Sequence, residues 1–197
     1  MYAWELPTSL EVCGKEYAIR TDYRVILDIL SAMNDPEIFE TGMTEDEKKI
    51  EQTMTMLQIL YIDFDSIPPR DYQEAAEKAV DFIDCGIKGD DKPKPRTMDW
   101  EQDAPIIAPG VSKVAGRDIR VGKTHWWEFF GYYLGIGEGV FNTIVSIREK
   151  RRKGNKLEKW EKEFYQNNKN LIDLKIKKIE RSDEEKEALR DLFGLKK

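Results

Sequence analysis

Large aromatic side chains are concentrated in one short stretch, and this feature limits how the chain can fold more than any other. Six of the eight residues from Trp126 to Tyr133 are tryptophan, phenylalanine or tyrosine. Aromatic side chains bury a large area each and dominate protein cores and interfaces. At helical spacing, one face of the stretch collects Trp126, Phe129, Phe130 and Tyr133. We therefore predict an aromatic helix with Thr124 as its N-cap, this face in the core, and Trp127 outside it.

The N-terminal region predicts a small hairpin. Two short runs with β-branched and aromatic members, Leu10–Val12 and Tyr17–Ile19, flank a turn that contains Gly14. Apolar runs around a glycine turn are typical of a β-hairpin. The alternation is brief, so we expect a lid or an edge rather than a large sheet.

Three amphipathic helices are predicted between this hairpin and residue 87. The first follows Thr21 or Asp22, either of which has a side-chain oxygen suited to an N-cap. The second opens with a capping box, because Glu47 lies three residues after Thr44. The third begins at Asp71 after a proline-containing break. The expected apolar face of the second helix consists of Ile50, Met54, Leu57 and Tyr61.

Charge and proline content divide the chain into four segments. Residues 88–97 hold two prolines, one glycine, six charged residues and no apolar residue, a composition typical of a linker. Beyond it, we expect Pro109 and Gly110 to interrupt the helix that begins near Asp99. The predicted segments are an N-terminal half (1–87), a linker (88–98), an aromatic helical half (99–154) and a charged arm (155–197). The resulting fold class is mostly α: a helical bundle with a short N-terminal β-hairpin and a charged C-terminal helical arm.

The charge of the chain is unevenly distributed. The net charge is −6 over 197 residues, which argues against nucleic acid as the main partner. Residues 148–197 carry 17 basic and 11 acidic side chains, so this segment has a charge of +6 and the rest has −12. An acidic body with a basic arm favours self-association or an oppositely charged partner. We therefore expect a homo-oligomer.

No residue pattern indicates a catalytic or metal site. His125 is the only histidine, and although Glu128 lies one helical turn away to orient it, no nucleophile is assigned. The glycines at 135, 137 and 139 lack the spacing and the preceding strand of a phosphate loop, so we interpret them as a hinge. Cys13 and Cys85 have neither metal-ligand spacing nor a paired base. We expect no enzymatic activity, no metal and no cofactor.

The sequence also predicts where the protein resides. Residues 1–7 include an acidic residue and no basic residue, unlike a signal peptide. No window approaches the roughly 20 apolar residues of a membrane span. We therefore expect a reducing cytoplasm and no membrane partner.

The basic cluster from Arg148 to Lys153 is the strongest local electrostatic feature. It has two interpretations: a site for phosphate or an acidic protein surface, or the start of a solvated helix supported by ion pairs four residues apart. The charged helix that follows alternates in sign and is sparse in apolar residues. At the C-terminus, Leu189, Leu192 and Phe193 predict a short amphipathic helix.

Several of these stretches together resemble a family of small proteins from tailed phages and prophages of Gram-positive bacteria. The resemblance rests on Trp100 with Asp103, on the H-W-W-E-F-F run from His125, and on an apolar helix ending at Ile147-Arg148. Upstream, Leu6-Pro7, Ile67-Pro68 and the run from Phe82 to Gly86 fit the same pattern. It spans roughly residues 6–171.

The resemblance implies a tail-assembly chaperone of the bacterial host cytoplasm. Members are usually encoded between the major tail protein and the tape-measure protein, and this position suggests that they hold the aggregation-prone tape measure until the tail tube polymerises. Such proteins usually have a continuous helix after the position of Asp103. This sequence departs from that pattern, because its prolines are expected to interrupt the helix. The alternatives are a structural or connector protein retained in the virion and a nucleic-acid-associated phage protein. The residues predicted to bind a partner are Trp127, His125, Arg148, Arg151, Arg152 and Trp160.

Overall fold

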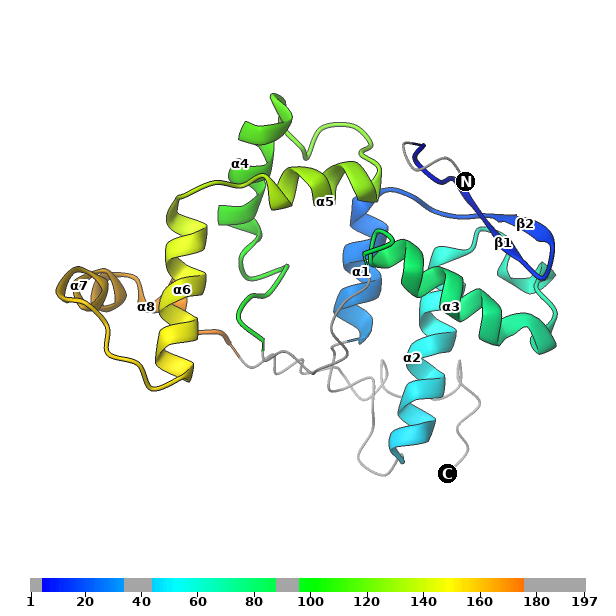
Figure 1. The fold of residues 1–197 in the computed structure, drawn as a ribbon, viewed down its shortest axis with the longest axis horizontal. Helices are drawn as coiled ribbons and strands as arrows, with labels where there is room; N and C mark the ends of the chain where they lie inside the picture. The colour runs from blue at the N-terminus through cyan, green and yellow to red at the C-terminus, as the bar shows by residue number, and fades with distance from the viewer. Residues whose placement is uncertain (1–4, 34–43, 88–95, 176–197) are drawn as a thin grey trace, which may run out of the picture.

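The computed structural model describes residues 5–33, 44–87 and 96–175, which form a mostly helical fold with one short hairpin (Figure 1). This confirms the predicted fold class. The strands are β1 (Ser9–Val12) and β2 (Lys15–Ala18), and the helices of the first half are α1 (Tyr23–Met33), α2 (Glu45–Leu60) and α3 (Tyr72–Ile83). Two 3₁₀ turns, η1 (Phe64–Ser66) and η2 (Pro69–Asp71), precede α3. The second half holds α4 (Ala104–Ala115), α5 (Trp126–Leu134), α6 (Val140–Arg152), α7 (Lys159–Asn167) and α8 (Lys169–Ile172).

These elements are arranged along the long axis of the molecule. The hairpin and α1–α3 form one end, α4 and α5 lie in the middle, and α6–α8 form the other end (Figure 1). Residues 88–95 of the predicted linker and residues 176–197 of the predicted arm, with Leu189, Leu192 and Phe193, lie outside the described residues.

The hairpin is antiparallel, as predicted, and covers part of the core. Val12 pairs with Lys15, and the two residues between them have φ angles of 49° and 77°. Positive φ at both turn positions matches the twist of the strands, and glycine adopts it without strain. The hairpin directs Leu10, Val12 and Tyr17 into the core.

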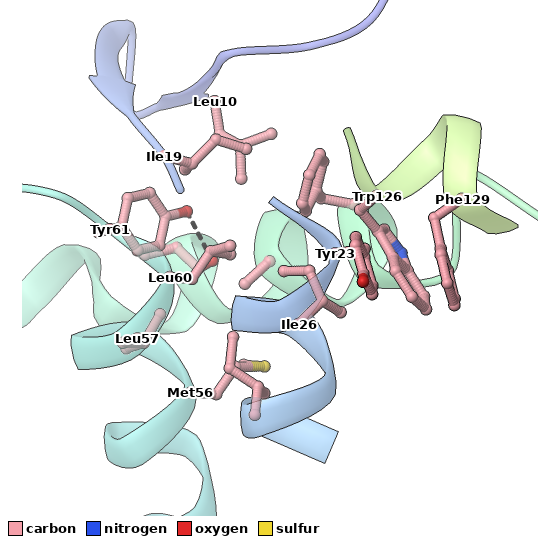
Figure 2. Packing of buried hydrophobic residues seen from close by; sticks show 14 of the residues in the cluster. Leu10, Ile19, Tyr23, Ile26, Met56, Leu57, Leu60, Tyr61, Trp126 and Phe129 are labelled. Carbon is pink, nitrogen blue, oxygen red and sulfur yellow. Dashed lines mark hydrogen bonds between the residues drawn. The ribbon is translucent and has the colours of Figure 1, made fainter. Parts of the chain in front are cut away.

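The main core lies where α1, α2 and α3 meet α5 (Figure 2). The ring of Tyr23 in α1 stacks on Phe129 in α5, with 4.3 Å between the ring centroids. At the end of α2, Tyr61 is fully buried, and its hydroxyl donates to the carbonyl oxygen of Ala75 at 2.9 Å. This bond satisfies the one polar group of the tyrosine side chain, so burial of the ring stabilises the fold.

Helix α2 buries only its C-terminal half. The predicted capping box is confirmed, because Thr44 and Glu47 exchange side-chain and backbone hydrogen bonds. The buried residues are Met56, Leu57 and Leu60, whereas Ile50 of the predicted apolar face is exposed. The prediction was wrong at Ile50 because α1 ends beside Gln52, whose side chain donates to the carbonyl of Met33, and α2 extends past the end of α1 (Figure 1).

Helix α4 is continuous, so the predicted interruption at Pro109 and Gly110 was wrong. A proline inside a helix removes one backbone hydrogen bond and crowds the preceding turn. Here tertiary packing offsets that cost: Ile107 and Val111 are buried on one face of α4. Gly110 also admits the side chain of Ile136, since a Cβ at Gly110 would lie 3.2 Å from its Cδ1. The helix that the phage family leads one to expect after Asp103 is therefore present.

The far end of the molecule has a small apolar cluster of its own. Ile144 and Ile147 of α6 pack with Ile172 of α8, and Ile106 of α4 contacts both this cluster and the main core. The described part of the charged arm is not one long exposed helix. It breaks at Asn168, and α8 folds back against α6.

Candidate partner interface

The aromatic helix α5 begins one residue later than predicted. Its N-cap is His125, whose Nδ1 accepts a hydrogen bond from the backbone N–H of Trp127 at 3.1 Å. Thr124 is buried and has another role. Its carbonyl accepts from the N–H of Tyr23, and its hydroxyl accepts from Arg117 at 2.8 Å. Thr124 therefore joins the start of α5 to α1, and its assignment as the N-cap was wrong.

His125 also links the N-terminal segment to α5. Its Nε2 lies 2.9 Å from the carbonyl oxygen of Pro7. A carbonyl only accepts, so Nε2 carries the proton while Nδ1 accepts from the helix N-terminus. Both ring nitrogens are thereby hydrogen-bonded to backbone groups, an arrangement that holds the N-terminal segment against the start of α5. The predicted partner contact of His125 stays a prediction.

Two tryptophans of α5 cap the C-terminal end of α3. The indole N–H of Trp126 donates to the carbonyl of Ile83, and that of Trp127 donates to the carbonyl of Phe82, each at 2.8 Å. The last carbonyls of a helix have no partner within the helix. The Phe82 carbonyl also accepts from the backbone N–H of Cys85, so the indole bond matters most for the Ile83 carbonyl, whose other donor in the described residues is the Cys85 thiol at 3.9 Å. Trp126 and Phe129 are buried, and Phe130 and Tyr133 of the same predicted face pack against the core.

Trp127 is only half-buried, but it is not a free surface residue. Its ring stacks on that of Phe82 with 6.0 Å between centroids, in addition to the indole hydrogen bond. Replacing it would therefore disturb the α3–α5 contact. Its predicted role in partner binding stays a prediction, and Trp127 is a poor position at which to test that role.

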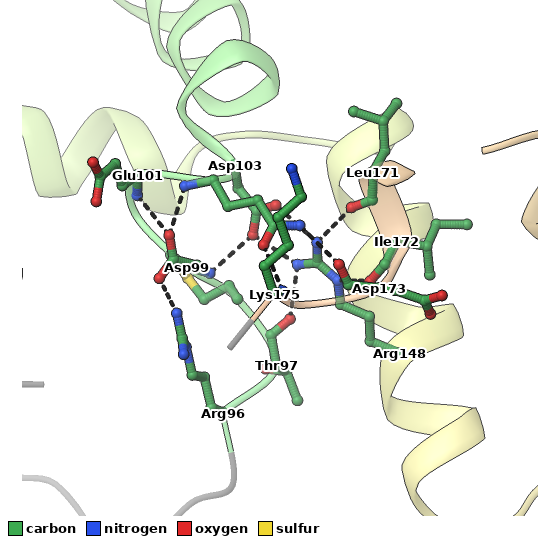
Figure 3. A network of polar contacts seen from close by, with 12 residues as sticks. Arg96, Thr97, Asp99, Glu101, Asp103, Arg148, Leu171, Ile172, Asp173 and Lys175 are labelled. Atoms are coloured by element: carbon green, nitrogen blue, oxygen red, sulfur yellow. Dashed lines mark hydrogen bonds and ion pairs between the residues drawn. The ribbon is translucent and has the colours of Figure 1, made fainter. Parts of the chain in front are cut away.

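Arg148 is the centre of a buried polar network (Figure 3). It forms a two-pronged ion pair with Asp103 at 2.7 and 2.8 Å, and the two side chains are only 6% and 1% exposed. Its remaining N–H groups donate to the carbonyls of Thr97, Leu171 and Ile172. All five guanidinium N–H groups therefore have an acceptor. The side chain predicted to meet a partner instead joins the start of α4 to α6 and α8.

Neighbouring residues extend this network. The Asp99 carboxylate accepts from the backbone N–H of Gln102 and pairs with Arg96. The Gln102 side chain donates to the carbonyl of Asp173 and accepts from the N–H of Lys175, both at 2.9 Å. Gln102, which precedes α4, thus binds the chain that follows α8.

The other basic residues of the cluster lie at the surface. Arg151 is exposed, pairs with Asp173, and lies 4.0 Å from the ring centre of Tyr165. Arg152 is also exposed. In α7, Trp160 is 57% exposed, which is unusual for so large an apolar side chain. Partner contacts by these three residues stay predictions, and each side chain is accessible for them.

An exposed apolar surface at the junction of α4, α5 and α6 was missed in the sequence. We name Val114, Leu134, Ile136 and Val140 the apolar corner. Val114 is 42% exposed, Leu134 is 62% exposed and Val140 is 52% exposed. The three helices meet because α4 contacts both α5 and α6, and α5 ends against α4, where a Cβ at Gly135 would lie 3.1 Å from a methyl group of Val114. Exposed apolar surface of this kind often marks a binding site.

The loop between α5 and α6 leaves room beside the apolar corner. A Cβ added at Gly137 or Gly139 would meet no atom within 4 Å. The amide of Asn142 holds the loop by donating to the carbonyl of Gly137 at 2.8 Å. The loop does connect two helices, as predicted. Its small residues permit a partner backbone to approach closely.

The cysteine thiols have high pKa values. A hydrogen bond from its thiol to Glu74 raises the pKa of Cys13 to about 12, and burial raises the pKa of Cys85 to about 12. Both thiols are protonated at neutral pH, and the thiolate is the reactive form. Over the described ranges, no group of three or more histidine, cysteine or carboxylate side chains is placed to hold a metal ion. Within residues 5–33, 44–87 and 96–175, every helix is too short or too polar to cross a membrane.

Comparison with known proteins identifies the family. A family model described as "Bacteriophage Gp15 protein" matches residues 4–174. No curated protein matches the chain, and no solved structure matches it. The family match includes the hairpin, the aromatic helix, the Asp103–Arg148 pair and the apolar corner. Since it covers most of the chain, the protein belongs to the Bacteriophage Gp15 protein family.

Proposed function

We propose that this phage protein is a tail-assembly chaperone. It has no enzymatic activity, self-associates, and binds the tape-measure protein in the cytoplasm of the bacterial host until the tail tube is built. The apolar corner is the observation that carries this proposal, because three exposed apolar side chains belong to helices α4, α5 and α6, of which α4 contacts both others. The phage family supports the biological setting.

The chemistry of the apolar corner suits an amphipathic helix. Such a helix presents side chains at spacings of three and four residues to an apolar surface, and the contact removes apolar area from water on both sides. Leu134 and Val140 lie on either side of the glycine loop, and Val114 lies on the adjoining helix. A tape-measure protein is long and helical, so it offers many such faces.

The double substitution Leu134→Glu and Val140→Glu should abolish the ability of the protein to keep the tape-measure protein soluble. Both side chains are exposed, so the variant should fold normally while its surface repels an apolar helix face. We expect the affinity for the tape-measure protein to fall roughly tenfold or more, as when central apolar anchors of an interface are lost. The measurement is the soluble fraction of the tape-measure protein on co-expression with each form of the full chain.

A matched control carries Ile50→Glu and Ile62→Glu. These isoleucines are 64% and 55% exposed but lie on and just after α2, away from the apolar corner. The control should keep the tape-measure protein as soluble as the wild type does. Equal rescue by both double variants would refute the role of the apolar corner, and failure of the wild-type chain itself would refute the chaperone function.

A further inference from the structure

Helix α3 presents an acidic outer face. Glu77, Asp81 and Asp84 are exposed on it at helical spacing, next to the exposed apolar residues Val80 and Ile87. Within the described residues, none of the ion pairs includes any of the three carboxylates. Although Asp84 is exposed as a residue, partial desolvation of its carboxyl group, together with the charge of Asp81, raises its pKa. A cation placed against this face would relieve the repulsion between the two aspartates.

The opposite end of the molecule presents a basic ridge. We define the basic ridge as Arg152, Lys156 and Lys159, which are exposed at the end of α6, in the loop after it and at the start of α7, where Lys159 directly precedes the exposed Trp160. None of the three has a carboxylate partner in the part of the chain that the structure describes. Their basic neighbours differ in this respect: Lys150 pairs with Glu161, Arg151 with Asp173, and Lys153 with Glu149.

The acidic face and the basic ridge cannot meet within one molecule. Helix α3 lies in the half that holds the hairpin, whereas α6 and α7 form the other end of the long axis (Figure 1). Complementary patches on different parts of a surface join copies head to tail, and such contacts build rings or open chains. The distribution of charge along the molecule therefore favours repeated association of identical copies.

We propose that the acidic face of α3 in one copy binds the basic ridge in a second copy of this chain. The proposal deepens the self-association in the proposed function by naming the two surfaces. Three carboxylates meet three cations that lack carboxylate partners among the described residues of their own chain. Val80 and Ile87 offer apolar area for Trp160, which is 57% exposed in the single chain. Charge complementarity sets the register of the contact, and the apolar residues add burial.

Charge reversal of each surface tests this contact. One full-length variant carries Glu77→Lys and Asp81→Lys, and another carries Arg152→Glu and Lys156→Glu. Sedimentation velocity of the purified wild type should show association that weakens as ionic strength rises, because exposed charges are screened. Each variant alone should associate roughly tenfold more weakly, since each reversal replaces an attraction between exposed charges with a repulsion. An equimolar mixture of the two variants should associate again.

The control reverses two carboxylates elsewhere by Glu11→Lys and Glu16→Lys. These residues are cross-strand neighbours on the exposed side of the hairpin. Because two carboxylates again become two lysines, the change in net charge equals that of the α3 variant. The control should associate like the wild type. A wild type that is monomeric at low ionic strength, or a mixture of variants that stays apart, would overturn the proposal.

The readout is independent of the chaperone test. Association is measured on the purified chain alone, so loss of tape-measure binding at the apolar corner leaves this result unaffected. If reversal of the basic ridge leaves self-association unchanged but removes binding to the tape-measure protein or to nucleic acid, the basic ridge serves that other partner and the proposal is wrong.

Discussion

Replacing Asp103 with alanine should lower the free energy of unfolding by about 3–5 kcal/mol, the usual cost of removing one member of a buried ion pair. The carboxylate accepts two hydrogen bonds from Arg148 and one from the backbone N–H of Asp99. Without it, the guanidinium remains buried with two unpaired N–H groups. Chemical denaturation of the full chain measures the loss, and α6 should come away from α4.

Two further variants distinguish the energetic cost of breaking the buried ion pair from that of breaking an exposed one. Removing both charges with Asp103→Ala and Arg148→Met should recover part of the loss, because no uncompensated charge remains in the interior. Arg151→Ala removes an exposed pair with Asp173 and a contact with the Tyr165 ring, and it should cost no more than about 1–2 kcal/mol. If Asp103→Ala is no more destabilising than Arg151→Ala, the buried network does not hold α4 to α6 and α8.

Trp126→Ala should be comparably destabilising, by about 3–5 kcal/mol, which is typical of removing a large aromatic side chain from a core. The ring is 2% exposed and stacks on Phe129, and its indole N–H donates to the carbonyl of Ile83. The substitution leaves a cavity between α3 and α5, and the Ile83 carbonyl at the end of α3 loses its indole donor and keeps the long contact with the Cys85 thiol. Thermal or chemical unfolding gives the size of the effect.

The matched control is another tryptophan. Trp160→Ala should change the free energy of unfolding by no more than about 0.5 kcal/mol, because that side chain is mostly exposed in α7. Trp126→Phe should fall between the two, since it keeps most of the packing and loses the hydrogen bond. Equal stability losses for Trp126→Ala and Trp160→Ala would contradict the placement of α5 in the core.

Local patterns made much of the fold predictable from the sequence. The capping box at Thr44, the glycine turn of the hairpin and the aromatic face of α5 each depend on residues within seven positions of one another. Helical and hairpin periodicities act over that range. Pro109 shows the limit: a local rule predicted a break, whereas the burial of Ile107 and Val111 keeps α4 continuous.

The candidate sites depend on contacts that the sequence does not display. Arg148 belongs by sequence to a basic cluster, but its partner Asp103 lies 45 positions away, so its burial could not be inferred from neighbours. The apolar corner likewise forms only when the end of α5 packs on α4 and brings Gly135 close to Val114. The apolar residues that flank the glycines at 135, 137 and 139 could have indicated this surface, but from the sequence we interpreted the glycines only as a hinge.

Hydrogen exchange on the complex with the tape-measure protein tests the central claim most directly. The wild-type chain, co-purified with that protein, is compared with the chain alone. Binding at the apolar corner predicts slower amide exchange in residues 135–140 and at the C-terminal end of α4, with little change in the hairpin. Unchanged exchange in residues 135–140 while the complex remains intact would contradict the claim, because the tape-measure protein would then bind elsewhere.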